Sequence, residues 1–284
     1  MLNIYTTEIR KSLSSKWFFI ALGIGCTLAI VSFAANAIQD YDSMTIGLKY
    51  IDQAYMMLSP LSCFKYWIVT DYLQPATDFF FVLLPLLATL PNAWSFLSER
   101  KNGAIKNSVT RTSRKSYYAA KYLATFISGG AVVVAPIILN LVLCACLMPA
   151  YMPDIYAVIY VGIYAESLWS EIYYNAPVLY CLMFVCMNFT FAGLWASFVM
   201  SLSFFIRNRI ALMVGPFLFL VFLKFFEEKL IGVVTVHPGL TPFTYLRGTG
   251  TAFFSNGYVI LAEFALLIAI VVVVTLANYR KDIL

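Results

Sequence analysis

The chain has 284 residues, of which 62% are hydrophobic and 12% are charged, with 19 lysine and arginine residues against 14 acidic residues. Soluble domains carry about 25% charged residues, so this composition excludes an ordinary water-soluble globule and predicts an all-α membrane protein. The six cysteines form no Cys-x-x-Cys pair, and we expect neither a disulfide nor a metal site from them.

Residues 2–16 place apolar and basic residues at helical spacing. Leu2, Ile9 and Leu13 stand among Arg10 and Lys11. This pattern predicts an amphipathic interfacial helix that lies on the inner leaflet before the chain turns into the membrane.

Six apolar segments follow, each long enough to cross a bilayer as a helix, which takes roughly 20 residues, and the third and fourth are long enough to tilt or bend. We therefore predict a single transmembrane domain over residues 1–284. Pro136 and Pro216 predict kinks in the third and fifth spans. The predicted spans are 17–37, 78–97, 122–148, 178–205, 210–226 and 257–277.

Most lysines and arginines lie at the two termini, in the 98–121 connection and at Arg207 and Arg209. Since cytoplasmic connections carry the excess of these residues, both termini are predicted to be cytoplasmic. Three connections are then external. The last of them, with Pro238 and Pro242, is too apolar for a free loop and too broken for a span. It predicts a broken extracellular segment of two short, partly embedded helices before the last span.

Residues 99–121 hold seven of the 19 lysines and arginines. Gly103 permits a sharp turn, and Ile105 and Val109 stand four residues apart, so they would share one face of a short helix. This spacing predicts a docking surface for a soluble partner; the alternative is a solvated loop held against anionic lipid. The residues expected to form the surface are Glu99, Arg100, Gly103, Ile105, Lys106, Val109, Arg111, Arg114 and Lys121.

Common catalytic and nucleotide-binding motifs are missing from the sequence. It contains no G-x-x-x-x-G-K-[ST] loop, no H-E-x-x-H and no G-x-S-x-G. The one histidine, His237, falls in an external connection, where it is typical of a loop residue. We expect no catalytic residue, metal or cofactor on this chain.

Acidic residues in the apolar segments stand near the external ends. Asp78, Glu227 and Glu263 are expected where water reaches, with no carboxylate at mid-depth, which argues against a transporter driven by a proton or ion gradient. A membrane enzyme would need clustered acids, whereas irregular spacing in the first external connection predicts a solvated face. The aspartates concerned are Asp40, Asp42, Asp52 and Asp71.

A mostly aromatic stripe recurs at helical spacing along the fourth span, and a second buried amide stands in the third. The stripe would suit a path for a bulky amphipathic substrate, and the alternative is ordinary bundle core. The predicted path residues are Asn140, Phe184, Asn188, Phe191 and Trp195, with Phe198 continuing the stripe.

Two faces carry a small residue every four positions, which lets helices approach closely in lipid. Packing within the chain is favoured over dimerisation, although both remain open. The faces are Ala21, Gly25 and Ala29 in the first span and Gly193, Ser197 and Ser201 in the fourth.

Together these features resemble the membrane subunit of ABC-2-type exporters. The family tends to show Glu-Arg, a glycine four residues after the glutamate, an apolar residue, then basic and hydroxyl residues before a lysine that opens the third span. This chain departs from the pattern in two places, because Ala104 replaces the usual threonine or serine and no proline precedes Ser113. The matching residues are Glu99, Arg100, Gly103, Ile105, Arg111, Ser113, Arg114 and Lys121.

The resemblance implies that the basic segment forms a cytoplasmic coupling helix, which sits in a cleft of a separate ATPase subunit. ATP and Mg would bind to that partner, in two copies, and a second six-span permease, the same or a sister chain, would complete the path. It further implies a bacterial plasma membrane, no nucleic acid, and export of an amphipathic substrate such as an antimicrobial peptide, a lipid-like molecule or a drug. The alternatives are a multi-pass membrane enzyme and a non-transporting scaffold or sensor subunit.

Overall fold

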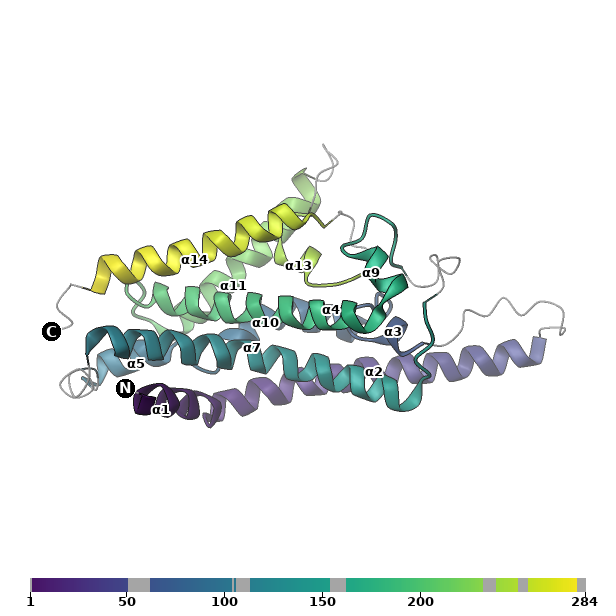
Figure 1. The fold of residues 1–284 in the computed structure, drawn as a ribbon, viewed down its shortest axis with the longest axis horizontal. Helices are drawn as coiled ribbons and strands as arrows, with labels where there is room; N and C mark the ends of the chain where they lie inside the picture. Colours follow the sequence, from purple (N-terminus) through teal and green to yellow (C-terminus); the bar gives the residue numbers. More distant parts are fainter. Residues whose placement is uncertain are drawn as a thin grey trace.

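The computed structural model describes residues 2–50, 62–103, 105, 113–153, 162–231, 239–249 and 255–279. All regular structure in these ranges is helical, and none of it is strand, as the composition predicts. The long helices run side by side along the longest axis of the molecule (Figure 1). The first helix, α1, and the end of the last, α14, lie at the same end, so both ends of the described chain are on one side of the bundle (Figure 1).

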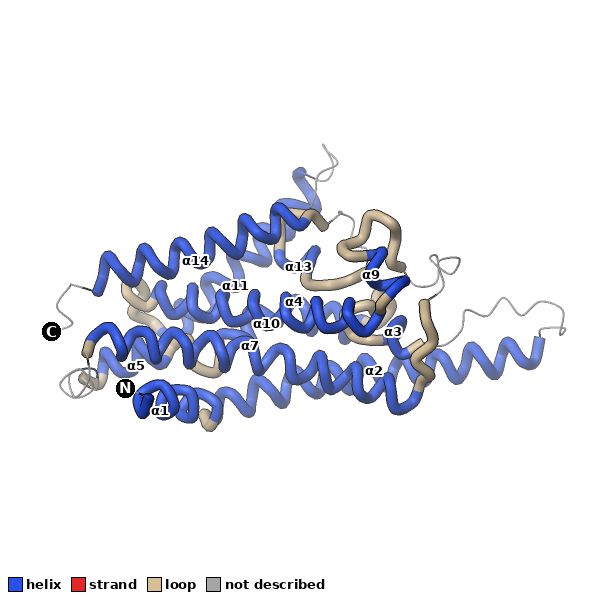
Figure 2. The backbone as a smooth tube through the Cα atoms, in the orientation of Figure 1, coloured by secondary structure: helices blue, strands red, loops and turns tan. Residues whose placement is uncertain are grey.

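Five helices in the described part of the chain are long and apolar enough to cross a membrane. They appear with the shorter helices as blue tube in Figure 2. The five are α2 Lys16–Tyr50, α7 Arg114–Leu147, α10 Pro177–Leu202, α11 Arg209–Phe226, which continues into the π-helical turn η2 Glu227–Ile231, and α14 Gly257–Tyr279. The shorter ones are α1 Leu2–Leu13, α3 Cys63–Tyr66, α4 Pro75–Thr89, α5 Ser95–Lys101, α9 Ser170–Asn175 and α13 Pro242–Tyr245.

The predicted single span over 78–97 is wrong as one helix. α4 ends at Thr89, a turn follows, and α5 begins at Ser95. Pro91 lies in the turn and has no N–H with which to continue the helical ladder. A helix of the length of α4, 15 residues, covers about 22 Å, less than the roughly 30 Å of a bilayer core.

Other boundaries also differ from the prediction. The helix predicted over 2–16 is present as α1, while its place at a membrane surface stays a prediction. The first predicted span continues well beyond residue 37, since α2 runs to Tyr50. α7 begins at Arg114 rather than at residue 122, because Ser113 caps it and accepts a hydrogen bond from the Ser116 N–H (3.2 Å).

Small residues bring α7 and α10 into close contact at the centre of the bundle. A Cβ added to Gly129 would lie 2.7 Å from the Ala196 Cβ and 3.1 Å from the Ala192 carbonyl oxygen. A Cβ on Gly193 would lie 2.8 Å from the Phe126 carbonyl oxygen. These small faces therefore pack within the chain.

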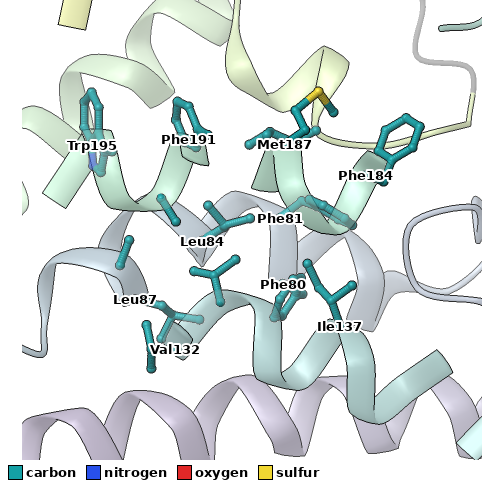
Figure 3. Packing of buried hydrophobic residues seen from close by; sticks show 14 of the residues in the cluster. Phe80, Phe81, Leu84, Leu87, Val132, Ile137, Phe184, Met187, Phe191 and Trp195 are labelled. Carbon is teal, nitrogen blue, oxygen red and sulfur yellow. The ribbon is translucent and has the colours of Figure 1, made fainter. Parts of the chain in front are cut away.

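The first small-residue face also packs within the chain. A Cβ on Gly25 would meet the ring of Pro136 at 2.7 Å, and Ala21 and Ala29 are fully buried. Apolar side chains of α4, including Phe80 and Leu84, pack against α7 and α10 in the same core (Figure 3).

The last two long helices stand at the margin of the bundle. Only 17% of the apolar window of α11 and 11% of that of α14 are buried, against 44% for α7 and 50% for α10. Broad apolar faces of α11 and α14 are thus left for lipid or for another protein chain.

Candidate functional site

Five side chains form an ion cluster where α1, α5 and α7 meet: Glu8, Lys11, Glu99, Tyr117 and Lys121. The Lys121 ammonium is fully buried and lies 2.9 Å from Glu8 Oε2 and 2.7 Å from Glu99 Oε1. The Lys11 ammonium also donates to Glu99 Oε1, and the Tyr117 hydroxyl donates to Glu99 Oε2 (2.6 Å). The cluster therefore fastens the start of the basic segment to two other helices.

Charge pairing outweighs burial within this cluster. Burial alone would raise the pKa of Glu99, but Lys121, Lys11 and the Tyr117 hydroxyl hold that pKa below its ordinary value of 4.5. Burial would likewise lower the pKa of Lys11, and its bond to Glu99 raises that pKa above 10.5. Both groups are consequently held in their charged forms.

The expected coupling residues fall into three groups. Glu99 and Lys121 belong to the ion cluster. Arg100 is exposed, and Gly103 has a φ of 68°, the left-handed turn that its sequence position predicts. Ile105 differs from the expectation of an apolar face offered to a partner, because it is only 3% exposed and packs into the core of its own chain. Lys106, Val109 and Arg111 lie outside the described residues.

Arg114 is half-buried in the first turn of α7. The predicted third span begins at residue 122, which leaves Arg114 in the preceding connection; the structure instead places it in α7.

A basic surface lies beside the ion cluster, at the end of α5 and the start of α11. Lys101, Arg207 and Arg209 border an open cavity of about 620 Å³. Arg209 donates to the Ser98 hydroxyl (2.8 Å), and its guanidinium lies 4.8 Å from the centre of the Trp94 ring. The distribution of lysine and arginine in the sequence predicts that these cations lie on the same side of the membrane. Only the structure shows that they form one surface.

A second, apolar cavity of about 470 Å³ lies between α10, α11, α14 and the 239–246 segment. Phe191, Trp195 and Phe198 of α10 line it, together with Pro216 of α11. Figure 3 shows Phe191 and Trp195 on the side of α10 away from the core residues of α4. Among the described residues that line this cavity, only Glu263 is charged.

Some of the predicted path residues line the apolar cavity, whereas the others connect segments of the fold. Phe191 and Trp195 line the apolar cavity, whereas Phe184 packs against Trp169 with ring centres 5.3 Å apart. Asn188 donates to the Leu246 carbonyl (3.2 Å). Asn140 has the partners that a buried amide requires, which are the Ile68 N–H (2.7 Å) and the Ala29 carbonyl (2.8 Å). Neither amide lines the cavity, so this part of the predicted path is not brought together.

Carboxylates from three helices hold the 239–249 segment. Glu227, at the end of α11, accepts from the Thr241 hydroxyl (2.7 Å) and from the Leu240 N–H. The Tyr245 hydroxyl donates to Glu263 of α14 (2.5 Å). Arg247 pairs with Asp78 of α4 (2.5 Å). Of the two short helices predicted before the last span, the described residues contain one, the buried α13, and its extracellular position stays a prediction. Residues 232–238, with His237, lie outside the described part of the chain.

Two acids expected in water are buried instead. Glu227 and Asp71 are each 3% exposed. Asp71 accepts hydrogen bonds from Asn36 (3.0 Å), Thr77 (2.8 Å) and the Leu73 N–H (2.9 Å), so donors replace the water that it loses. Asp42 is exposed as predicted, while Asp52 and the Asp40 side chain lie outside the described part of the structure.

The described residues contain no group of three or more histidine, cysteine, aspartate or glutamate side chains that could hold a metal ion. Comparison of the chain with protein-family models, with curated proteins and with solved structures finds no match. The site must therefore be interpreted from its own geometry.

Proposed function

We propose that this chain is the membrane permease subunit of an ATP-driven exporter of the ABC-2 type, which couples ATP hydrolysis by a separate ATPase subunit to export of an amphipathic substrate. Peptides, lipid-like molecules and drugs belong to that substrate class. The proposal draws on the sequence resemblance, on the helical architecture and on the placing of both chain ends at one end of the bundle.

The ion cluster is the single observation that carries the proposal. A permease driven by a separate motor needs a rigid link between the docking segment and the long helices. Lys121 provides one, because its buried ammonium ties the start of the basic segment to α1 and α7. Separating these charges inside the protein would leave them without partners, which is strongly unfavourable. A push on the segment is thus transmitted to α7, which packs along α10.

The docking surface that we propose comprises the exposed Arg100 with Lys101, Arg207 and Arg209. Cations gathered on one face would steer and orient an acidic cleft of the partner. ATP and Mg would bind on that partner, in two copies. The broad apolar faces of α11 and α14 would suit a second permease, the same or a sister chain.

Purification of the tagged protein from its native bacterial membrane in mild detergent, followed by mass spectrometry, tests the proposal. We expect a P-loop ATPase in stoichiometric amount and, if the permease is a heterodimer, a second six-span chain. Recovery of no ATPase, under conditions that preserve other membrane complexes, would contradict the proposal and turn attention to a membrane enzyme or a scaffold subunit.

Charge reversal locates the docking surface. We expect the double variant Arg100→Glu and Lys101→Glu to lose the ATPase at least tenfold in co-purification, with unchanged membrane insertion. Lys115→Glu is the matched control, because Lys115 is an exposed cation of the same basic segment on α7. Substitution of the buried Ile105 would disturb folding and is a poorer test. Equal recovery of the ATPase with both variants would place docking elsewhere.

A further inference from the structure

The apolar cavity has the size and lining of a small-molecule site. Its volume of about 470 Å³ falls within the roughly 300–1,000 Å³ that is usual for ligand pockets. Leucines of α11 and α14 form much of its wall, with Leu220 and Leu266 among them. Such a wall favours the apolar parts of a ligand and gives them no hydrogen-bonding partner.

Three aromatic rings of α10 form one side of this cavity. The rings of Phe191 and Trp195 lie nearly parallel, at 15° with centres 6.2 Å apart, and Trp195 and Phe198 follow at 5.3 Å. Aromatic faces, tryptophan above all, attract organic cations. The buried indole N–H of Trp195 also has no hydrogen-bond acceptor among the described residues.

Two carboxyl groups at the cavity form no ion pair with the described cations. Glu263 lines the cavity, and its Oε2 accepts from Tyr245, while no described group donates to its Oε1. Glu227 lies next to the cavity behind Thr241 and forms no ion pair in the described part of the chain. The nearby ammonium of Lys224 is directed to Glu228 (3.7 Å) instead. A ligand that enters this space therefore meets carboxyl groups that have no cationic partner among the described residues.

We propose that the cavity binds a hydrophobic organic cation, with the cationic centre between Glu263 and the face of Trp195 and the apolar parts against α11 and α14. Charge complementarity selects this class, because a cation supplies the positive partner that Glu263 and Glu227 lack among the described residues, whereas an anion or a neutral hydrocarbon does not. That such cations are the exported substrate rests on the proposed function; that they bind here does not.

Two nearly isosteric ions of opposite charge, tetraphenylphosphonium and tetraphenylborate, test the proposal on the unmodified protein. Equilibrium binding is measured with the full chain in nanodiscs of zwitterionic phosphatidylcholine, and binding to empty nanodiscs is subtracted. We expect saturable binding of the phosphonium at about one molecule per chain and at least tenfold weaker binding of the borate. Equal or tighter binding of the borate would overturn the proposal, as would phosphonium uptake that does not saturate, which would indicate lipid in the cavity.

Two variants with the same charge change then locate the site. Glu263→Gln can still accept the Tyr245 hydroxyl, and we expect it to weaken phosphonium binding at least tenfold. Glu228→Gln removes a nearby carboxylate that does not line the cavity, and binding should stay within twofold. Equal effects of the two variants would refute the assignment of the site.

Failure of this inference can be told from failure of the proposed function. The binding measurement contains no ATPase, so loss of phosphonium selectivity would contradict only the assignment of the cavity. Absence of an ATPase from the purified complex would contradict only the proposed exporter function. If both hold, tetraphenylphosphonium should stimulate ATP hydrolysis by the complex, and that stimulation should be lost in Glu263→Gln and kept in Glu228→Gln.

Discussion

At the end of the molecule where α1 and α5 meet, Glu8 and Glu99 share the ammonium of buried Lys121, whereas around α13 Glu227 and Glu263 are held by hydroxyl groups and a backbone N–H. Both arrangements satisfy hydrogen-bonding oxygens. Only the first also compensates the charge within the described structure. A compensated carboxylate ties helices together, and an uncompensated one is left to attract a cation from outside.

Packing differs between the same two regions. α7 and α10 meet through glycine and alanine at backbone distance, while only small parts of the apolar windows of α11 and α14 are buried. The tightly packed pair forms the framework of the fold. α11 and α14 form one wall of the apolar cavity opposite α10. A site that binds and releases a ligand is expected where the packing is weaker.

Removal of the Lys121 ammonium should have the largest effect. Lys121→Met keeps the length of the side chain but leaves Glu8 and Glu99 without their buried partner, so we expect the free energy of unfolding to fall by about 3 kcal/mol. Unfolding by sodium dodecyl sulfate in mixed micelles measures this change. Lys115→Met, at an exposed position of the same helix, should be nearly neutral. Similar stability of the two variants would mean that the ion cluster contributes little to the stability of the fold.

Hydropathy predicts most of the long helices, because apolar runs of sufficient length are a local property of the chain. It misplaces the start of α7, since a lysine within an apolar helix is unfavourable in lipid and a span is therefore expected to begin beyond it. The structure neutralises Lys121 with Glu8, 113 residues earlier. No local pattern contains that pairing.

Site residues were predictable where one helix supplies them. Phe191 and Trp195 stand one turn apart on α10, so the helical spacing of aromatic residues in the sequence identifies both. Asp71 and Ile105 were expected to be accessible, and both are buried, because distant segments of the chain cover them. The role of Glu263 at the cavity depends on the position of the 239–246 segment, which periodicity does not encode.

A methyl group placed at two helical glycines should separate the tight region from the loose one. Gly129→Ala pushes a Cβ to 2.7 Å from Ala196 and 3.0 Å from the Ala88 carbonyl oxygen. Overpacking of this kind costs about 2 kcal/mol. A Cβ on Gly215 of α11 meets nothing within 4 Å, and alanine favours a helix over glycine by up to about 1 kcal/mol. The same detergent titration should therefore show a loss for the first variant and a small gain for the second; a loss for both would mean that α11 is as closely packed as α7.

Acid should weaken the ion cluster, and this effect is the smallest of the three. The pKa of Glu99 is lower in the folded protein than its ordinary value of 4.5. The unfolded state therefore takes up a proton first, and the stability contributed by Glu99 is present above pH 4.5 and lost as the pH falls through the folded pKa. One proton limits the slope to about 1.4 kcal/mol per pH unit. Glu99→Gln should flatten the decline of stability below pH 4.5, whereas Glu171→Gln, at an exposed carboxylate of α9, should leave it unchanged. An unaltered decline in Glu99→Gln would mean that another carboxylate governs acid stability, and that the contrast between the compensated and uncompensated ends does not extend to their proton equilibria.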